Sequence, residues 1–309
     1  MKIAIYGVGG VGGYFGAVLA RAGDSVSMVA RGEHLKAIRA GGLRIQTPKE
    51  EFTIKPAAAS DNPADIGPVD SVIVGVKAWQ VPDAARAMRP LLKSGTRVVP
   101  LQNGVEAVDQ LVEVLGREHV LGGLCRVIAS IAAPGVIKIG GLEPAVVLGE
   151  VDGSALNGNA KALLDALHAA GVNVKATPDI QAALWEKLLF ISSISGVGAV
   201  SRATAGEMRQ VRPTRELVQR MMEEVAAVAR KRGVRLADDI VARNLAFIDS
   251  IPGEGTASMQ RDIVNGRPSE LEAIVGSVVR LGRAAAVAVP AMEFTYAALL
   301  PQEIRARGK

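Results

Sequence analysis

The residues of this chain that could do chemistry begin with a glycine-rich turn, Gly7-Val8-Gly9-Gly10-Val11-Gly12, between a short apolar run and a helical pattern. In this context the G-x-G-x-x-G spacing is typical of dinucleotide binding. Gly7 permits a tight turn, Gly9 lets backbone N–H groups approach a pyrophosphate, and Gly12 allows close packing of helix on strand. The helix N-terminus adds the positive end of a dipole. The alternative is an ordinary glycine-rich connection.

A second candidate lies where the adenosine ribose of such a cofactor is expected, at Met28-Val29-Ala30-Arg31-Gly32. An NAD enzyme usually ends this strand with an acid that binds the ribose 2′-hydroxyl. Here no acid is present, and the Arg31 guanidinium could pair with a 2′-phosphate. This pattern favours NADP over NAD, the alternative being that Arg31 is a surface arginine beside Glu33.

Lys187 is the most informative single residue, because it interrupts a helical pattern that is apolar on most faces. Reduction of a carbonyl requires a proton donor, and a partly buried ammonium group can supply one. Ile191 and Ser195 follow one and two turns later on the same helical face. The alternative is that Lys187 pairs with Glu186 or Glu207.

Other candidates stand at predicted element ends. Lys77 and Asn103 follow two strands of a predicted parallel sheet, whose carboxyl ends are where ligands bind. On their own, Lys77 also fits a surface lysine and Asn103 a turn residue before Gly104. Ser258 and Glu270 lie in predicted helices near the carboxyl end, where the helix dipole alone could stabilise a carboxylate at Glu270.

The elements that must position these residues fall into two parts. Up to residue 176, strands alternate with helical patterns, which predicts an α/β domain of Rossmann type with a parallel sheet. Residues 177–309 show helical patterns, which predicts an all-helical second domain, with Thr177 as the cap of its first helix and a Ser269/Glu272 capping box later. Between residues 121 and 150 the pattern suggests hairpins added to the sheet. The predicted strands are Ile3–Tyr6, Ser25–Ala30, Ser71–Val76, Thr96–Pro100 and Ala145–Gly149.

The composition of the chain limits the classes of ligand and partner that it could bind. The chain has 309 residues, 49% of them hydrophobic and 3% aromatic, with a formal net charge of +5. Scattered basic residues and few aromatics argue against nucleic acid, and mild basicity suits small acidic ligands. One cysteine and three dispersed histidines predict no metal site. The uncharged run Ile3–Ala20 contains too many glycines for a membrane span or signal peptide, so we expect a cytoplasmic protein away from membranes.

Taken together, these residues resemble the ketopantoate reductase (2-dehydropantoate 2-reductase) family. The resemblance covers nearly the whole chain and rests on motifs in the same order. They are the glycine turn, Arg31, Lys77-Ala78-Trp79-Gln80, Gln102-Asn103-Gly104, Leu184-Trp185-Glu186-Lys187-Leu188, Ser258-Met259-Gln260-Arg261-Asp262 and Gly266-Arg267-Pro268-Ser269-Glu270. It implies NADPH-dependent reduction of ketopantoate to pantoate, in pantothenate biosynthesis, by an enzyme that commonly forms homodimers.

The resemblance also implies individual roles. Lys187 would protonate the carbonyl oxygen, and Asn103 would contact both cofactor and substrate. Lys77 would bind the cofactor, Ser258 the substrate carboxylate, and Glu270 the nicotinamide ribose. Arg31 would bind the 2′-phosphate.

The sequence departs from the family pattern where the substrate should bind. Ile191, Ser195 and Ala205 stand at positions that the family usually fills with asparagines. Each lost hydrogen bond should reduce discrimination by about 1–3 kcal/mol. The alternatives are therefore a related reductase of a bulkier or more apolar 2-oxo acid, because Ile191 and Ala205 would widen an apolar wall, and a regulatory protein that binds NADPH without turnover. Ile191 and Ser195 are expected to contact the substrate in either reductase. A β-hydroxyacid dehydrogenase shares the two-part architecture but fits Arg31 and the Lys77 segment less well.

Overall fold

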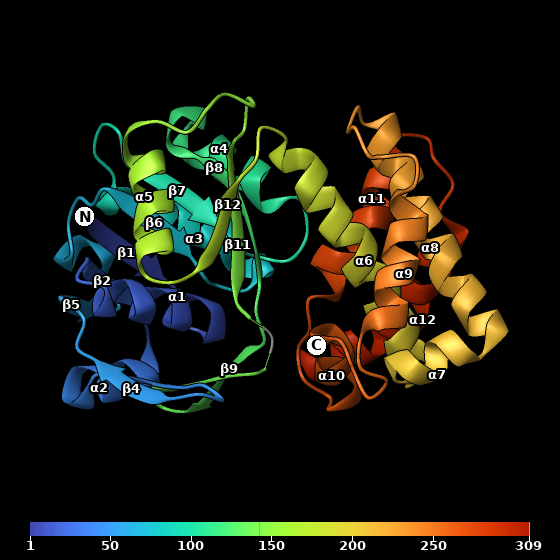
Figure 1. Ribbon diagram of the computed structural model, residues 1–309, viewed down its shortest axis with the longest axis horizontal. Helices are drawn as coiled ribbons and strands as arrows, with labels where there is room; N and C mark the ends of the chain where they lie inside the picture. The colour runs from blue at the N-terminus through green and yellow to red at the C-terminus, as the bar shows by residue number, and fades with distance from the viewer. Residues whose placement is uncertain (142, 309) are drawn as a thin grey trace. The chain divides into compact units, whose positions relative to one another are not determined.

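The computed structural model describes residues 1–141 and 143–308, which form two compact units (Figure 1). The first comprises Met1–Gln102 and Ala107–Ile180, and the second comprises Asn103–Glu106 and the described residues from Gln181 onward. The sequence predicted a single boundary between residues 176 and 177. It did not predict that Asn103–Glu106 would belong with the second unit.

A parallel sheet forms the centre of the first unit, with strand order β5-β2-β1-β6-β7. The predicted α/β class is confirmed, and four of the predicted strands form this sheet in parallel register. The order reverses beside β1, which is where open α/β sheets bind ligands. The bounds are β1 Lys2–Tyr6, β2 Ser25–Val29, β5 Ala58–Ser60, β6 Ser71–Val74 and β7 Arg97–Pro100.

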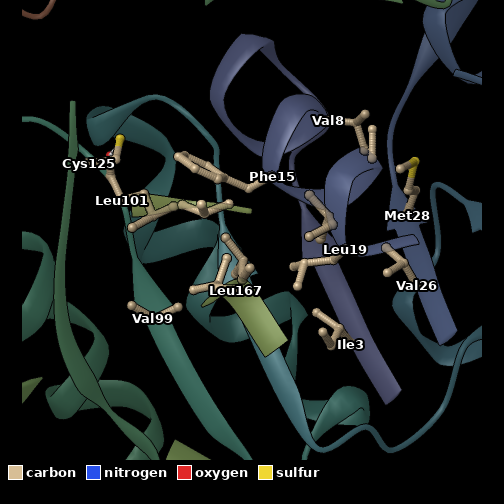
Figure 2. Close-up of a cluster of buried hydrophobic side chains, with 14 of the residues drawn as sticks. Ile3, Val8, Phe15, Leu19, Val26, Met28, Val99, Leu101, Cys125 and Leu167 are labelled. Atoms are coloured by element: carbon tan, nitrogen blue, oxygen red, sulfur yellow. Dashed lines mark hydrogen bonds between the residues drawn. The ribbon is translucent and has the colours of Figure 1, made fainter. Parts of the chain in front are cut away.

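Helices pack against this sheet and bury its hydrophobic side chains. Phe15 on α1 extends toward Leu101 and Cys125 at the carboxyl end of β7 and on β8, and Leu167 on α5 joins the same buried cluster (Figure 2). This packing fixes the turn that precedes α1 relative to the sheet. The bounds are α1 Gly10–Arg21, α2 Gly32–Gly41, α3 Val81–Ala87, α4 Ala107–Leu115 and α5 Gly158–Ala169, with short 3₁₀ turns η1 Pro63–Asp65, η2 Ala78–Gln80, η3 Arg89–Leu91 and η4 Arg117–His119.

The prediction that hairpins extend the central sheet was wrong. Strands β9 and β10 form a hairpin, but β10 pairs with β3, so the order β4-β3-β10-β9 makes a separate sheet. Strands β8 and β11 pair with β12 in a further sheet. The bounds are β3 Leu43–Gln46, β4 Glu51–Ile54, β8 Leu121–Arg126, β9 Ala129–Ala133, β10 Val136–Ile139, β11 Ala145–Glu150 and β12 Asn173–Ala176.

A largely buried ion pair joins the central sheet to the β12-β11-β8 sheet. The Arg97 guanidinium on β7 donates to the Glu150 carboxylate on β11 and to the Glu118 carbonyl oxygen. Glu150→Gln should lower the free energy of unfolding of this unit by about 1–3 kcal/mol, because the amide keeps an acceptor but leaves the arginine charge without its counterion. Urea denaturation measures the change.

The control for that variant is Asp165→Asn, which removes the exposed ion pair with Lys161 on α5. We expect this change to stay within about 0.5 kcal/mol, because exposed pairs contribute little. Equal effects of the two substitutions would contradict the assigned role of Arg97 and Glu150.

The described residues of the second unit form helices joined by loops, with no strand, as predicted. Its first helix starts at Ile180, slightly later than predicted, because the Thr177 hydroxyl accepts from the Asp179 amide in a turn before it. The sequence missed α7. The bounds are α6 Ile180–Ser201, α7 Ala205–Gln210, α8 Arg212–Lys231, α9 Ile240–Ser250, α10 Ser258–Val264, a π-helix η5 Glu272–Gly276, α11 Ser277–Ala284 and α12 Pro290–Ala306.

Helix α6 packs closely against α8 and α12 at Gly196. A Cβ at this position would lie 2.9 Å from the Met221 side chain on α8 and from the Thr295 side chain on α12. Within the described residues, α6 is the one helix whose length and hydropathy would suffice for a membrane span, and 67% of that window is buried inside the protein. A core helix explains its apolar character.

The predicted capping box at Ser269 and Glu272 was also wrong. The Ser269 hydroxyl accepts from the Leu271 amide and donates to Glu303, while Glu272 bonds Arg280 and Tyr296. The two side chains have different partners because η5 replaces the first turn of a regular α-helix.

Candidate functional site

The glycine turn has the backbone geometry that its sequence predicted. Gly7 has φ +96°, and a Cβ there would lie 2.7 Å from the Val76 nitrogen. A Cβ on Gly12 would lie 2.2 Å from the Gly7 oxygen, so these two positions require glycine. At Gly9 the nearest atom would be 3.7 Å away, which leaves space beside the backbone.

The N-terminus of α1 suits an anionic ligand. Among the described residues no side chain caps Gly9, and the first turn of α1 has no acidic residue. Its N–H groups and the helix dipole therefore fit a pyrophosphate. Val8 is buried in the core (Figure 2) and Val11 is half-buried, so the turn offers backbone rather than polar side chains. A Cβ on Gly10 would lie 2.6 Å from Ala129 backbone atoms, because β9 crosses here.

Arg31 lies at the same edge of the sheet as the glycine turn. It is exposed and precedes α2, and the Gly7 amide donates to the Val29 oxygen at 3.0 Å, which ties the two strand ends together. Burial raises the pKa of the Tyr6 hydroxyl, and the nearby Arg31 guanidinium partly offsets that rise. The cation thus lies beside the residue that precedes Gly7, where a 2′-phosphate would need it.

Gln102 is a positioning residue that sequence reasoning missed. Its buried amide Nε2 donates to the Val74 and Val76 oxygens at 2.8 and 2.9 Å, which holds the ends of β6 and β7 together. Lys77 follows β6 and is exposed, with Nζ 5.9 Å from the Trp79 ring centroid. The signal in the sequence that could have identified Gln102 was its amide side chain just after the end of an apolar strand.

Asn103 and Glu270, 167 positions apart, meet in the second unit. The Asn103 Nδ2 donates to the Glu270 Oε2 at 2.9 Å. Gly104 has φ +98°, and a Cβ there would lie 2.7 Å from the Ala273 oxygen, so only glycine allows this approach. Arg280 adds an ion pair to Glu106 at 2.8 Å. Segment 103–106 is therefore held against the chain around Glu270.

The π-helix beside Glu270 presents Glu272 to both Arg280 and Tyr296. π-helical turns are frequent at functional sites. Burial and the hydrogen bond to the Glu272 carboxylate raise the pKa of Tyr296 to about 12. Because the folded state holds this proton more tightly, the interaction stabilises the fold below the ordinary tyrosine pKa and is lost as pH rises through about 12.

This shift can be seen directly in the tyrosinate absorbance. Burial raises the pKa of Tyr6 and Tyr14 as well, so none of the chain's three tyrosines should ionise with the midpoint of a free tyrosine. Tyr296→Phe should remove the component near pH 12. Loss of a component near pH 10 instead would show that Tyr296 does not bond Glu272.

Lys187, Ile191 and Ser195 lie along α6 as predicted. Lys187 and Ile191 are half-buried and Ser195 is 3% exposed. Glu186 and Glu207 are the two carboxylates that the sequence suggested as partners of this lysine, and each contacts another residue. Glu186 lies 3.5 Å from Arg243, and Glu207 accepts from the Thr204 amide at 2.7 Å in the capping box of α7.

Ser258 is exposed at the start of α10, and hydrogen bonds to neighbouring segments fix the loop that precedes it. Buried Gln260 accepts from the Ala257 amide at 3.2 Å and donates to the Ala203 oxygen at 2.8 Å. The Ala205 amide donates to the Gly255 oxygen at 2.9 Å. Ala205 is fully buried, so it supports the loop before Ser258 by packing.

The structure thus groups the predicted site residues within each unit. The glycine turn, Arg31 and Lys77 share the carboxyl edge of the parallel sheet. In the helical unit, Asn103 contacts Glu270, while Lys187 and Ile191 share α6 and Ser258 lies on α10. A parallel sheet whose glycine turn has no side-chain cap is the architecture of a dinucleotide-binding protein, and the half-buried lysine of the helical unit is compatible with a dinucleotide-dependent oxidoreductase.

Comparison with known proteins defines the family. The family model described as "Ketopantoate reductase PanE/ApbA" matches residues 3–153, and its C-terminal counterpart matches residues 179–303. The chain belongs to the ketopantoate reductase family. A 2-dehydropantoate 2-reductase of Mesorhizobium japonicum is 33% identical over 305 residues, 92% of each chain.

Solved structures agree. A PanE/ApbA family ketopantoate reductase from Ralstonia eutropha has TM-score 0.90 and 32% identity, covering 99% of this chain and 100% of that one. A ternary structure of D-mandelate dehydrogenase with NADH and anilino(oxo)acetate has TM-score 0.88 and 25% identity, with coverage of 99% and 100%. The protein is therefore an oxidoreductase acting on CH–OH groups, with a nicotinamide dinucleotide cofactor and a small oxo acid substrate.

Proposed function

We propose that this enzyme reduces a 2-oxo acid with NADPH, and that 2-dehydropantoate is its first candidate substrate. The observation that carries the proposal is the Asn103–Glu270 hydrogen bond, which joins two predicted site residues from opposite halves of the sequence. The related 2-dehydropantoate 2-reductases support the choice of substrate.

When bound, the reduced nicotinamide supplies a hydride to the carbonyl carbon of the substrate. The chain's own residues must then orient the carbonyl and neutralise its oxygen. Lys187 donates a proton from Nζ to that oxygen as negative charge develops on it. Its position on the buried helix α6 restricts the motion of this donor.

The other residues bind and orient. The Glu270 carboxylate fixes the Asn103 amide, which leaves the amide oxygen able to accept from a ligand. Ser258, exposed at the start of α10, would donate its hydroxyl proton to the substrate carboxylate. The backbone of Gly7–Gly12 would hold the pyrophosphate, with Lys77 nearby at the end of β6.

Arg31 should determine the choice between NADPH and NADH. Arg31→Ala should raise the dissociation constant for NADPH by about 10–100-fold, because a charge-assisted contact to the 2′-phosphate is lost. The constant for NADH should change less than about threefold. Titration of cofactor fluorescence measures both, and Lys36→Ala, which removes an exposed cation on the helix that Arg31 precedes, is the control. Equal losses for both cofactors would contradict the assignment.

A second candidate is the reduction of a more apolar 2-oxo acid. Half-buried Ile191 offers hydrocarbon where the family usually has an amide. D-mandelate dehydrogenase, which shares this fold, is complexed with NADH and anilino(oxo)acetate in a solved structure. An apolar side chain gains from contact with such a wall.

Steady-state assays decide between these candidates. NADPH and NADH consumption should be followed with 2-dehydropantoate and with phenyl(oxo)acetate, and kcat/KM compared for the four combinations. We expect the highest value for NADPH with 2-dehydropantoate. Cofactor binding without turnover of any 2-oxo acid would instead favour the regulatory alternative.

A further inference from the structure

Two residues, Glu303 on the last turns of α12 and Arg307 directly after it, bind the amide, hydroxyl and carbonyl groups of Ser269. The Ser269 amide donates to the Glu303 Oε1 and Oε2 atoms at 3.1 and 3.0 Å, and its hydroxyl donates to Oε2 at 2.6 Å. Arg307 donates from Nε to the Glu303 Oε1 at 2.6 Å and from Nη2 to the Ser269 carbonyl oxygen at 2.8 Å. We call Ser269, Glu303 and Arg307 the α12 clamp.

Ser269 and Glu303 are buried, and Arg307 is half-buried. Ser269 is 0% and Glu303 2% exposed, and the Arg307 side chain is 23% exposed. Burying a carboxylate is costly even when it is paired, and apolar packing often stabilises a protein as well or better. Fixing one short segment of backbone is a benefit that apolar packing could not supply with the same geometry.

The segment that the clamp fixes leads directly into Glu270. On the far side of Glu270, its carbonyl oxygen accepts from the Ala273 and Ile274 amides at 3.1 and 2.9 Å. The backbone is therefore held both before and after the residue whose carboxylate accepts from Asn103. A shift of the backbone by about 1 Å would break that hydrogen bond, and small misplacements at a site can cost about 10²-fold in rate.

We propose that Glu303 and Arg307 are positioning residues that hold the Glu270 carboxylate toward Asn103, and thereby set the affinity for the nicotinamide cofactor. The inference rests on the proposed role of Glu270 in cofactor binding. It assigns a function in the site to the last described turn of the chain, although neither residue is part of a sequence motif.

A double-mutant cycle tests the inference through the dissociation constant for NADPH, measured by cofactor fluorescence, together with kcat/KM. Arg307→Ala should raise that constant by about tenfold. In a Glu270→Ala background the same change should raise it by less than about twofold, because the carboxylate that the clamp positions is already absent. Arg305→Ala, an exposed arginine in the same turn, is the control and should have no effect.

Glu303→Gln provides a second variant in case Arg307→Ala does not fold. It keeps the side chain's size and one acceptor while it removes the charge that Arg307 binds, and the same non-additivity with Glu270→Ala is expected.

Two results would overturn the inference. One is an equal loss of affinity from Arg307→Ala in both backgrounds, since a purely structural residue acts independently of Glu270. The other is wild-type affinity in Arg307→Ala and Glu303→Gln. If the wild-type enzyme binds NADPH but reduces no 2-oxo acid, the proposed function fails, and the binding cycle still decides the role of the clamp.

Discussion

Lys187→Ala should lower kcat by about a thousandfold while the dissociation constant for NADPH changes less than about twofold. The lysine acts when charge develops on the carbonyl oxygen, so its loss raises the barrier without removing a ground-state contact to the cofactor. Its location on the largely buried helix α6 holds the ammonium group in place, which water alone cannot do in the variant. Stopped-flow turnover and fluorescence titration measure the two quantities.

Two further variants separate proton donation from charge alone. Lys187→Arg keeps the cation but is a poor acid, so its kcat should stay far below wild type. Added alkylamines should partly restore Lys187→Ala, with a rate that depends on the amine pKa. Lys231→Ala, on the exposed end of α8, is the control and should keep full activity. Turnover of Lys187→Ala within about tenfold of wild type would show that another group donates the proton.

Ile191→Asn should change substrate preference more than any other substitution at the proposed pocket. An amide at this position can hydrogen-bond a hydroxylated substrate and removes apolar contact from an aromatic one. The ratio of kcat/KM for 2-dehydropantoate over phenyl(oxo)acetate should therefore rise by about 10²-fold, each side contributing about 1–2 kcal/mol.

The control for this change is Val200→Asn, an exposed position near the end of the same helix. It should leave the ratio unchanged, because the substitution adds an amide without reaching the pocket. Substrate kinetics with both acids provide the ratio directly. If Ile191→Asn leaves it within about twofold of wild type, residue 191 does not contact the substrate.

The parallel sheet could be predicted because its strands are buried on both faces and therefore appear as continuous apolar runs, such as Ile3–Tyr6 and Ser71–Val74. Strand β5 could not, since Ala58–Ser60 is short and weakly apolar. The β3–β10 pairing was equally hidden, because it joins distant segments that carry no local signal of their partnership.

In the candidate site, too, local features could be predicted from the sequence and contacts between distant segments could not. The glycine turn is local, so its spacing alone predicted the conformation of Gly7 and the close packing at Gly12. The Asn103–Glu270 contact depends on tertiary packing, and only the family resemblance had suggested a common site. At Ser269 the local capping rule failed, because the buried carboxylate of Glu303, 34 residues away, accepts from the Ser269 amide that Glu272 would bind in a capping box.

The most direct test of the proposed function is a competition between substrates. The purified enzyme, with limiting NADPH, should be given equimolar 2-dehydropantoate and phenyl(oxo)acetate, and the two hydroxy acids quantified, because their ratio equals the ratio of kcat/KM. Under the proposed function, pantoate should predominate by at least about tenfold. A predominance of mandelate would contradict it and would identify the enzyme as a reductase of apolar 2-oxo acids.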